Sequence, residues 1–153
     1  MTGTAVRPLP AALRDTLREV AADPRLPHLL DPFAAERQWL ELPVSTDLQV
    51  WLISWPPGTG TGWHDHGAAA GAFTVVSGLL NEYTWVGGRQ VQTLGAGRTR
   101  TFAPGHIHDV QNLGRERVLS VHAYAPRLSS MARYRERDGR LVLTGVEAAG
   151  VQW

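Results

Sequence analysis

The chain has 153 residues, and its 15 Lys and Arg residues nearly balance its 14 Asp and Glu residues, which gives a formal net charge of +1 at pH 7. That length suits one domain with a buried core, and the balanced charge, without any Lys or Arg run, argues against a nucleic-acid partner. Cysteine is absent, which excludes disulfides and thiolate ligands, so a bound metal has to be held by His, Asp or Glu.

The N-terminal stretch MTGTAVRPLPAALRD is unlike a secretory signal, because two prolines interrupt it and it lacks a continuous apolar core. No run in the chain approaches the roughly 18 apolar residues that a membrane-spanning helix needs. We therefore expect a cytoplasmic protein without a membrane partner, present as a monomer or a small homo-oligomer.

An amphipathic helix is predicted near the N-terminus. Apolar residues recur there at the three- and four-residue steps of one helical face: Leu9, Leu13, Leu17 and Val20. We expect a helix over about residues 10–22, closed by Pro24, and a second short helix after Asp31. This helical segment is expected to take up about residues 1–45, in front of a β-barrel over about residues 46–153.

From about Leu48 the chain consists of short runs rich in Val, Trp, Tyr, Phe and Thr, separated by Gly, Pro and Asn. The runs read QVWLISW, AFTVVSGLLNEYTW, RQVQTL, TRTFA, HDVQN, VLSVHAYA and RLVLTGVE. Several short strands without long helices between them are typical of an antiparallel sandwich or barrel. Gly87-Gly88 and Asp138-Gly139 are predicted hairpin turns, because primed turns need positive φ angles. The sequence therefore predicts a single domain dominated by β structure.

Five of the six histidines lie in this β portion: His64, His66, His106, His108 and His122. In an extended strand, residues two apart share a face, so His64 and His66 are expected to direct both imidazoles toward one point inside the barrel. Such a pair, joined by a third histidine from a later strand, favours a metal site over ordinary hydrogen-bonded core histidines. Imidazole suits Zn, Cu, Ni and Fe alike, so the histidines alone do not select the metal.

Glycine and histidine spacing resembles the two motifs of the cupin family. The first motif is a glycine, a histidine pair, a glutamate and a closing glycine, and the matching positions here are Gly58, His64, His66, Gly71 and Gly78. The second motif is matched by PGHIHDVQN over residues 104–112, in which His108 and Asn112 keep the expected spacing. The resemblance implies a cupin fold, which is a double-stranded β-helix or jelly-roll barrel, here with short N-terminal helices.

Gly71 stands where most cupins carry a glutamate ligand. The nearest glutamate, Glu82, is too far along the chain to replace it. By this resemblance the metal ligands are three neutral imidazoles, from His64, His66 and His108. Small residues after His66 are expected to leave the carboxylate position empty and the metal accessible.

Ser120, His122 and Tyr124 form a second group, because they alternate with apolar residues in the run VLSVHAYA and so share one strand face. Polar side chains inside a barrel need partners. A chain of hydrogen bonds from serine to imidazole to phenol would fix the tautomer of His122 and aim the Tyr124 oxygen at a bound ligand. A polar strand surface facing solvent is the alternative interpretation.

Together these features resemble the cysteine dioxygenase family, the thiol dioxygenase branch of the cupins. The shared features are the HDH pair, the segment His108-x-Val-x-Asn, and the spaced Ser120, His122 and Tyr124 followed by Pro126. The resemblance implies an Fe(2+) cofactor on the three histidines and an outer triad of Ser120, His122 and Tyr124. It also implies that a small thiol and O2 are the substrates and that both oxygen atoms are added to sulfur, giving a sulfinate.

The chain departs from this family at several positions, including Ala125-Pro126-Arg127, where Ser-Pro-Pro is usual. Animal members carry, at the place of Gly71, a cysteine that is linked to the triad tyrosine, so this chain resembles the bacterial type without that crosslink. The arginine that binds the substrate carboxylate in the cysteine-using branch falls at Gln38 when residues are counted without gaps, and the branch using 3-mercaptopropionate is similar in having glutamine there. One gap moves the register to Arg37.

Five tryptophans are candidates for an aromatic pocket wider than cysteine needs: Trp39, Trp51, Trp55, Trp63 and Trp85. We count Trp63 among the substrate contacts, with Arg37, Gln38 and Tyr124. Cysteine, 3-mercaptopropionate and a larger thiol such as ergothioneine are all candidate substrates. Two other functions stay open: a non-catalytic metal-binding cupin that acts as a sensor or binding module, and a cupin dioxygenase acting on a carbon substrate.

Overall fold

The computed structural model describes residues 9–148, and residues 1–8 and 149–153 lie outside the described part, including the start of the segment discussed above as a signal sequence. Helix α1 (Leu9–Ala21) and a short 3-10 helix η1 (Leu26–His28) precede the strands. The strands of the described residues are β1 (Gln38–Leu42), β2 (Gln49–Trp55), β3 (Ala70–Ser77), β4 (Leu79–Trp85), β5 (Arg89–Gly95), β6 (Thr99–Phe102), β7 (His108–Gln111), β8 (Val118–Ala125), β9 (Ser130–Arg137) and β10 (Arg140–Ala148).

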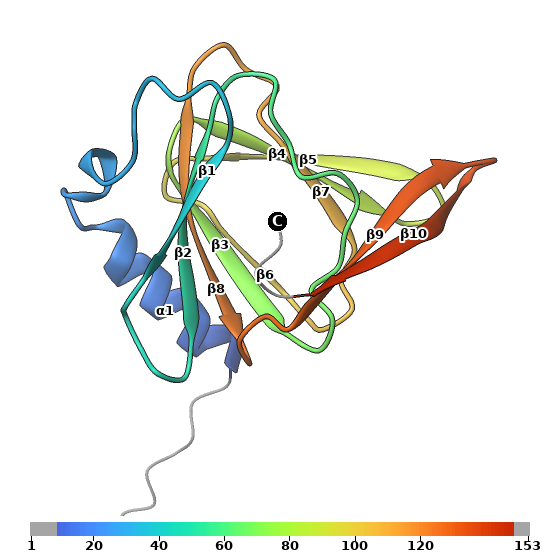
Figure 1. Cartoon of the computed structure of the whole chain (residues 1–153), viewed down its shortest axis with the longest axis horizontal. Coiled ribbons are helices and arrows are strands. Elements are labelled where there is room, and N and C mark those ends of the chain that lie inside the picture. Colours follow the sequence, from blue (N-terminus) through green and yellow to red (C-terminus); the bar gives the residue numbers. More distant parts are fainter. Residues whose placement is uncertain (1–8, 149–153) are drawn as a thin grey trace, which may run out of the picture.

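The strands of the described residues form three antiparallel sheets around a common interior (Figure 1). The largest sheet has the order β1-β2-β8-β3-β6, and the sheet β5-β4-β7 lies across the interior from it. Strands β9 and β10 form a two-stranded hairpin that extends away from the barrel (Figure 1). The predicted cupin barrel is confirmed by this arrangement.

Helix α1 packs on the outer face of the five-stranded sheet (Figure 1). Leu13 and Leu17 are buried there against Val121 and Ala123 of β8. Full burial of a leucine side chain contributes on the order of 1.5–3 kcal/mol, so this apolar stripe is what fixes the helix to the sheet. The predicted helix over residues 10–22 agrees with the observed one to within one residue at each end.

The predicted second helix after Asp31 is wrong, because the chain forms turns there and its 3-10 helix lies earlier, at Leu26–His28. The carboxylate of Asp31 accepts the backbone N–H of Phe33 over 2.9 Å. The Asp31 N–H donates to the side chain of Gln38 over 3.1 Å. These bonds form a local turn that leads directly into β1, so the helical segment ends before residue 45.

Strands β1 and β9 lie outside the predicted runs. The residues of β9, SMARYRER, are mostly polar and do not alternate as a typical strand does. This segment becomes a strand through its antiparallel pairing with β10. The turn between β9 and β10 was predicted, and Asp138 and Gly139 have φ angles of 51° and 74° there. The Gly87-Gly88 turn between β4 and β5 is likewise confirmed.

Side chains of β8 alternate between two buried clusters, one on each face of the five-stranded sheet. Val121 and Ala123 face α1, whereas His122 and Tyr124 face the barrel interior. Both polar residues are almost fully buried, with 4% and 6% of their surfaces exposed. The alternative of a polar strand facing solvent is therefore excluded.

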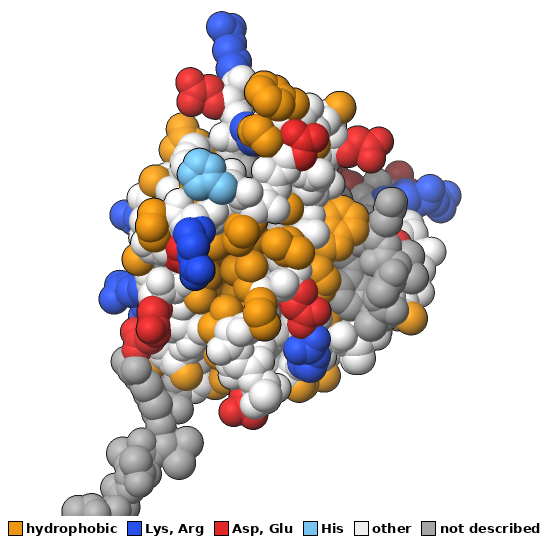
Figure 2. Space-filling view, turned by 60° about the vertical axis from the view of Figure 1, so that its left-hand side comes forward, with side chains coloured by type: hydrophobic (Ala, Val, Ile, Leu, Met, Phe, Trp, Pro, Cys, Tyr) orange, Lys and Arg blue, Asp and Glu red, His pale blue; other side chains and the backbone are white. Residues whose placement is uncertain are grey.

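The outer surface near the N-terminal half is partly apolar. Phe33 is 90% exposed and Leu29 is 46% exposed. Figure 2 shows hydrophobic side chains gathered in the middle of the face that is turned forward, with charged groups of both signs around them. No helix in residues 9–148 combines the length and apolar character needed to cross a membrane.

Candidate metal centre

Three histidines from two parts of the chain meet inside the barrel. His64 and His66 lie in the segment between β2 and β3, outside any regular strand, and His108 begins β7. The backbones of His64 and His108 exchange two hydrogen bonds, of 2.9 and 3.0 Å. This bridge keeps the segment extended, so His64 and His66 point the same way although the predicted strand is absent.

The three imidazoles form a compact cluster. Their ring centroids are 4.7 Å apart for His64 and His108, 4.8 Å for His64 and His66, and 5.0 Å for His66 and His108. One nitrogen of each ring lies within 4.8 Å of the others, and each residue is at most 3% exposed. Burial lowers the pKa of all three rings below the ordinary value, so each is in the neutral form that binds metal.

Hydrogen bonds orient two of these rings. Nδ1–H of His64 donates to the carbonyl of Gly62 over 2.8 Å, and Nδ1–H of His108 donates to Glu82 over 2.8 Å. Each bond leaves Nε2 of its ring without a proton and ready to bind a metal, the arrangement typical of metal-ligating histidines. Nδ1 of His66 is buried and has no partner within residues 9–148. The donor set and its protonation therefore fit a first-row metal ion.

Glu82 is a functional residue that the sequence analysis missed. It is 1% exposed, and its carboxylate accepts from Arg100 over 2.7 Å and lies 3.3 Å from Nε2 of His106, besides binding His108. Burial alone would raise the pKa of Glu82, but the hydrogen bonds from His106, His108 and Arg100 outweigh it and hold that pKa well below the usual range. Glu82 thus places a negative charge directly behind one candidate ligand. The sequence did contain a signal for it. Glu82 is two residues after Leu80 in a predicted strand, so the two side chains share the buried face, where a carboxylate needs partners.

The sequence predicts an empty space at Gly71, where most cupins carry a glutamate ligand. In the structure the ring of Phe102 fills that space. Strand pairing places Gly71 opposite Phe102 on one side and opposite Tyr124 on the other. The Phe102 ring lies over the glycine and is 8% exposed. The glycine therefore makes room for an aromatic ring and does not open a path to the metal.

The Ser120–His122 half of the predicted triad is present. The indole N–H of Trp55 donates to the Ser120 oxygen over 2.8 Å, and that oxygen lies 2.7 Å from Nε2 of His122. The Ser120 oxygen thus accepts from Trp55 and shares a hydrogen bond with His122, so the serine links the indole to the imidazole. Among residues 9–148, no hydrogen bond joins His122 to Tyr124 to complete the predicted chain.

Protonation of the triad is set by burial. Burial, and then the charges of His108 and Arg37, lower the pKa of His122 to about 3. Burial raises the pKa of the Tyr124 phenol above its ordinary value, and the charge of Arg37 opposes that rise. At neutral pH, His122 is therefore uncharged and Tyr124 keeps its proton as a hydrogen-bond donor.

A cavity of about 380 Å³ opens beside this cluster. Its lining includes His64, His108, His122 and Tyr124 on the metal side and Arg37 and Arg133 as cations. Much of the remaining wall is apolar, from Trp39, Trp51, Ile53, Trp55, Val110, Leu128 and Met131. A pocket of this size and character is typical of small-molecule sites.

Arg37, and not Gln38, lines the cavity. The guanidinium carbon of Arg37 lies 5.6 Å from the ring centroid of Trp39 and 5.1 Å from that of Trp55. Burial, and then the charge of Arg133, lower the pKa of Arg37 to about 10, so it stays charged at neutral pH. Gln38 is turned the other way by the two-residue period of the strand and accepts the Asp31 N–H.

Two of the five candidate tryptophans lie elsewhere. Trp63 and Trp85 pack edge to face with their ring centroids 5.9 Å apart, and neither lines this cavity. Trp63, predicted as a substrate contact, therefore packs outside the lining of this cavity. Trp39, Trp51 and Trp55 do line the cavity.

Asp65 and Asn112 hold the surrounding loops. Asp65 accepts the hydroxyl of Tyr134 over 2.7 Å, which ties the segment between the two histidines to β9. The Asn112 amide donates to the carbonyls of Trp55 and Glu116 over 2.9 and 2.8 Å. The asparagine of the second motif is thus a structural residue that fixes the end of β7.

The barrel and its inward histidines define a cupin. A solved structure with a double-stranded β-helix domain, from Klebsiella pneumoniae, is 22% identical, covers 78% of this chain and 94% of its own, and superposes with a TM-score of 0.58. A cupin superfamily protein from Desulfitobacterium hafniense is 16% identical, with 78% and 90% coverage and a TM-score of 0.54. These similarities establish the fold. The family model for cysteine dioxygenase type I matches residues 25–137, and the chain belongs to that family.

Proposed function

We propose that the protein is an Fe(II)-dependent thiol dioxygenase that converts a small thiol and O2 into a sulfinate. The reaction balances as RSH plus O2 giving RSO2H: sulfur loses four electrons and O2 gains four. The observation that carries the proposal is a cluster of three buried, neutral histidines, two of which, His64 and His108, line one cavity together with Tyr124 and Arg37. Membership of the cysteine dioxygenase type I family supports the same reaction class.

His64, His66 and His108 would hold the iron. Bound Fe(II) would supply the centre at which the thiolate and O2 react, since a metal with three protein ligands keeps open positions. Three neutral ligands leave the full positive charge of the ion on the site, which favours an anionic thiolate. Glu82 moderates that charge from behind His108.

Arg37 would anchor the carboxylate of the substrate. Its guanidinium is stacked against Trp39 and Trp55, so the side chain is held in place before a ligand arrives. Charged, planar and preorganised, it suits a carboxylate that has to be fixed while the thiol reaches the histidines. Gln38 has no part in this proposal because it faces away from the cavity.

Tyr124 would donate a hydrogen bond to the bound substrate. Its raised pKa keeps the phenol protonated, and the low pKa of His122, about 3, means that the ring does not take up a proton at neutral pH. His122 and Ser120 would therefore act by holding this wall of the cavity in position, with Trp55 fixing Ser120. The thiol proton is released to solvent.

The cavity supports a substrate larger than cysteine. Its volume of about 380 Å³ falls in the range of drug-sized ligand sites, and three tryptophans supply apolar wall beyond the arginine. We infer a thiol acid whose body packs on Trp39 and Trp51. Ergothioneine fits this description, and cysteine and 3-mercaptopropionate are the smaller alternatives.

Oxygen uptake tests the proposal. Protein loaded anaerobically with Fe(II) is mixed with air-saturated buffer and one thiol at a time: cysteine, 3-mercaptopropionate, cysteamine or ergothioneine. One thiol should consume O2 in equal amount and gain two oxygen atoms, and zinc-loaded protein should consume none. Full iron occupancy without uptake on any thiol acid would instead favour the non-catalytic binding module.

A further inference from the structure

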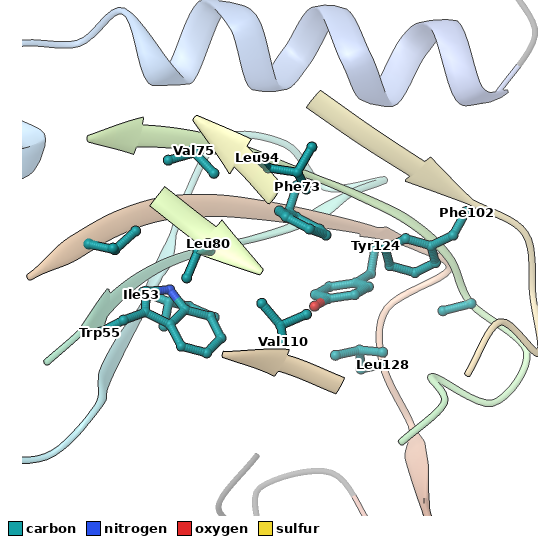
Figure 3. Close-up of a cluster of buried hydrophobic side chains, with 12 residues drawn as sticks. Ile53, Trp55, Phe73, Val75, Leu80, Leu94, Phe102, Val110, Tyr124 and Leu128 are labelled. Carbon is teal, nitrogen blue, oxygen red and sulfur yellow. The ribbon is translucent and has the colours of Figure 1, made fainter. Parts of the chain in front are cut away.

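Gly71 is a glycine because of space and not because of its backbone conformation. Its φ angle lies outside the left-handed region that favours glycine. A Cβ at this position would lie 2.5 Å from Cε2 of Phe102, closer still to Cζ of that ring, and 3.0 Å from Cδ1 of Tyr124. The rings of Phe102 and Tyr124 lie side by side (Figure 3), with their centroids 6.4 Å apart, and both would contact a side chain at position 71.

His66 differs from the other two candidate ligands in how it is held. His64 and His108 each donate an Nδ1–H to a fixed acceptor, over 2.8 Å in both cases. Nδ1 of His66 is buried and has no hydrogen-bond partner in the described part of the chain. Metal-ligating histidines nearly always have such a partner to fix the ring, so something else has to orient His66.

Phe102 has the contacts to do this. Its ring stacks on His66 with centroids 4.8 Å apart and planes 23° apart. It meets the ring of His108 at 5.2 Å, and the Tyr124 ring lies 5.0 Å from His66. Since Phe102 is nine-tenths buried, its own orientation is fixed by close packing.

We propose that Phe102 is a positioning residue: admitted by Gly71, its ring replaces a hydrogen bond in setting the orientation of His66 toward the metal. The same ring fills the space beside Tyr124 and so restrains the tyrosine by packing. The inference rests on the metal site of the proposed function but not on the thiol chemistry. It is therefore tested by metal binding, without turnover.

The test is an anaerobic titration with Co²⁺, whose visible absorption reports ligand geometry. Phe102→Leu keeps an apolar side chain but removes the flat ring, and we expect Co²⁺ to bind at least about 10-fold more weakly, with an altered visible spectrum. Unchanged affinity and spectrum in Phe102→Leu would overturn the proposal.

Phe73→Leu is the matched control. Phe73 belongs to the same buried cluster, but its ring stacks on His122 at 5.2 Å, reaches His108 only at 6.3 Å and has no ring contact with His66. This variant should lose stability as Phe102→Leu does, while its Co²⁺ affinity stays within about 2-fold of wild type. An equal loss of affinity in both variants would show a general packing effect and contradict the proposal.

Gly71→Ala tests the same relationship with the ring retained. The added methyl group has to displace Phe102, so Co²⁺ affinity should fall, and Gly71→Ala/Phe102→Leu should bind no worse than Phe102→Leu alone. Additive losses of affinity in the double variant would contradict the coupling. If Phe102→Leu does not fold, the single variant Gly71→Ala is the test, and unchanged Co²⁺ affinity in it would overturn the proposal. If these results appear while no thiol is oxygenated, the reaction proposal fails and the role of Phe102 stands.

Discussion

Nδ1–H of His108 donates to the carboxylate of Glu82 over 2.8 Å, inside a barrel where Glu82 is 1% exposed. Most cupins place a glutamate directly on the metal, and by resemblance Gly71 stands at that position here. Glu82 returns a negative charge to the site, one imidazole away from the metal position. In the proposed site the carboxylate therefore acts through a hydrogen bond to the ligand His108.

Glu82→Gln should weaken metal binding about 10- to 100-fold, because the amide accepts a hydrogen bond from His108 but carries no charge. The measurement is a competition titration with a chelator of known affinity. Glu147→Gln is the control: Glu147 also pairs with an arginine, Arg133, over 3.2 Å, but it touches no candidate ligand. Equal metal affinity in wild type and Glu82→Gln would remove Glu82 from the site.

Tyr124→Phe should lower turnover by about 100-fold, at the low end for a positioned proton donor, while metal affinity stays the same. The change removes one buried hydroxyl group and keeps the ring against His66. Steady-state oxygen uptake and metal content are measured on the same sample. Tyr83→Phe, on β4 beneath Arg89, should keep full turnover. An unchanged rate in Tyr124→Phe would exclude the proposed donor role.

Arg37→Gln should raise KM by about 10- to 100-fold for thiols with a carboxylate, the usual cost of losing a hydrogen bond to a charged group. Cysteamine has no carboxylate, so its KM should hardly change. Gln38→Ala should leave KM for every thiol near the wild-type value, because Gln38 is outside the cavity. The opposite result, with Gln38→Ala raising KM and Arg37→Gln silent, would contradict the assignment.

The metal-free protein should lose stability as the pH falls below about 6.5, the ordinary histidine pKa in an unfolded chain. His64, His66, His108 and His122 have lowered pKa values in the folded state, so below pH 6.5 the unfolded chain binds more protons than the folded one. Each contributes a loss of up to about 1.4 kcal/mol per pH unit, and for His122 this continues down to about pH 3.

Urea denaturation checks this between pH 7 and pH 5, above the range in which Glu82 takes up a proton. The free energy of unfolding should drop by at least about 2 kcal/mol. His122→Phe removes one of the four groups and should flatten the dependence. A constant free energy of unfolding over this range would contradict the buried, neutral state of these histidines.

Local patterns in the sequence predict much of this molecule. The apolar face of α1, which includes Leu13, and the polar and apolar alternation in β8 on either side of His122 are properties of short segments, and the sequence predicts both. The polar strand β9 has no such pattern, and it forms because the turn at Asp138 returns the chain onto β10. Histidine spacing likewise indicated which side chains share a site before any contact was visible.

Contacts between distant strands were beyond the reach of the sequence. Glu82 on β4 meets His108 on β7, and Phe102 on β6 covers Gly71 on β3, because of sheet pairings that no local spacing encodes. The choice between Arg37 and Gln38 depends on one residue of register at the start of β1, and of the two only Arg37 lines the cavity. A single domain over the whole chain and a cytoplasmic location stay predictions from the sequence.

The central claim is that both atoms of one O2 molecule are transferred to the sulfur of a thiol at the three-histidine site. The most direct measurement is product mass after turnover of the Fe(II)-loaded protein with isotopically labelled O2 in unlabelled water. The account predicts a sulfinate in which both added oxygen atoms carry the label. A product with one labelled oxygen, a disulfide, or no oxidised thiol despite bound iron would contradict it.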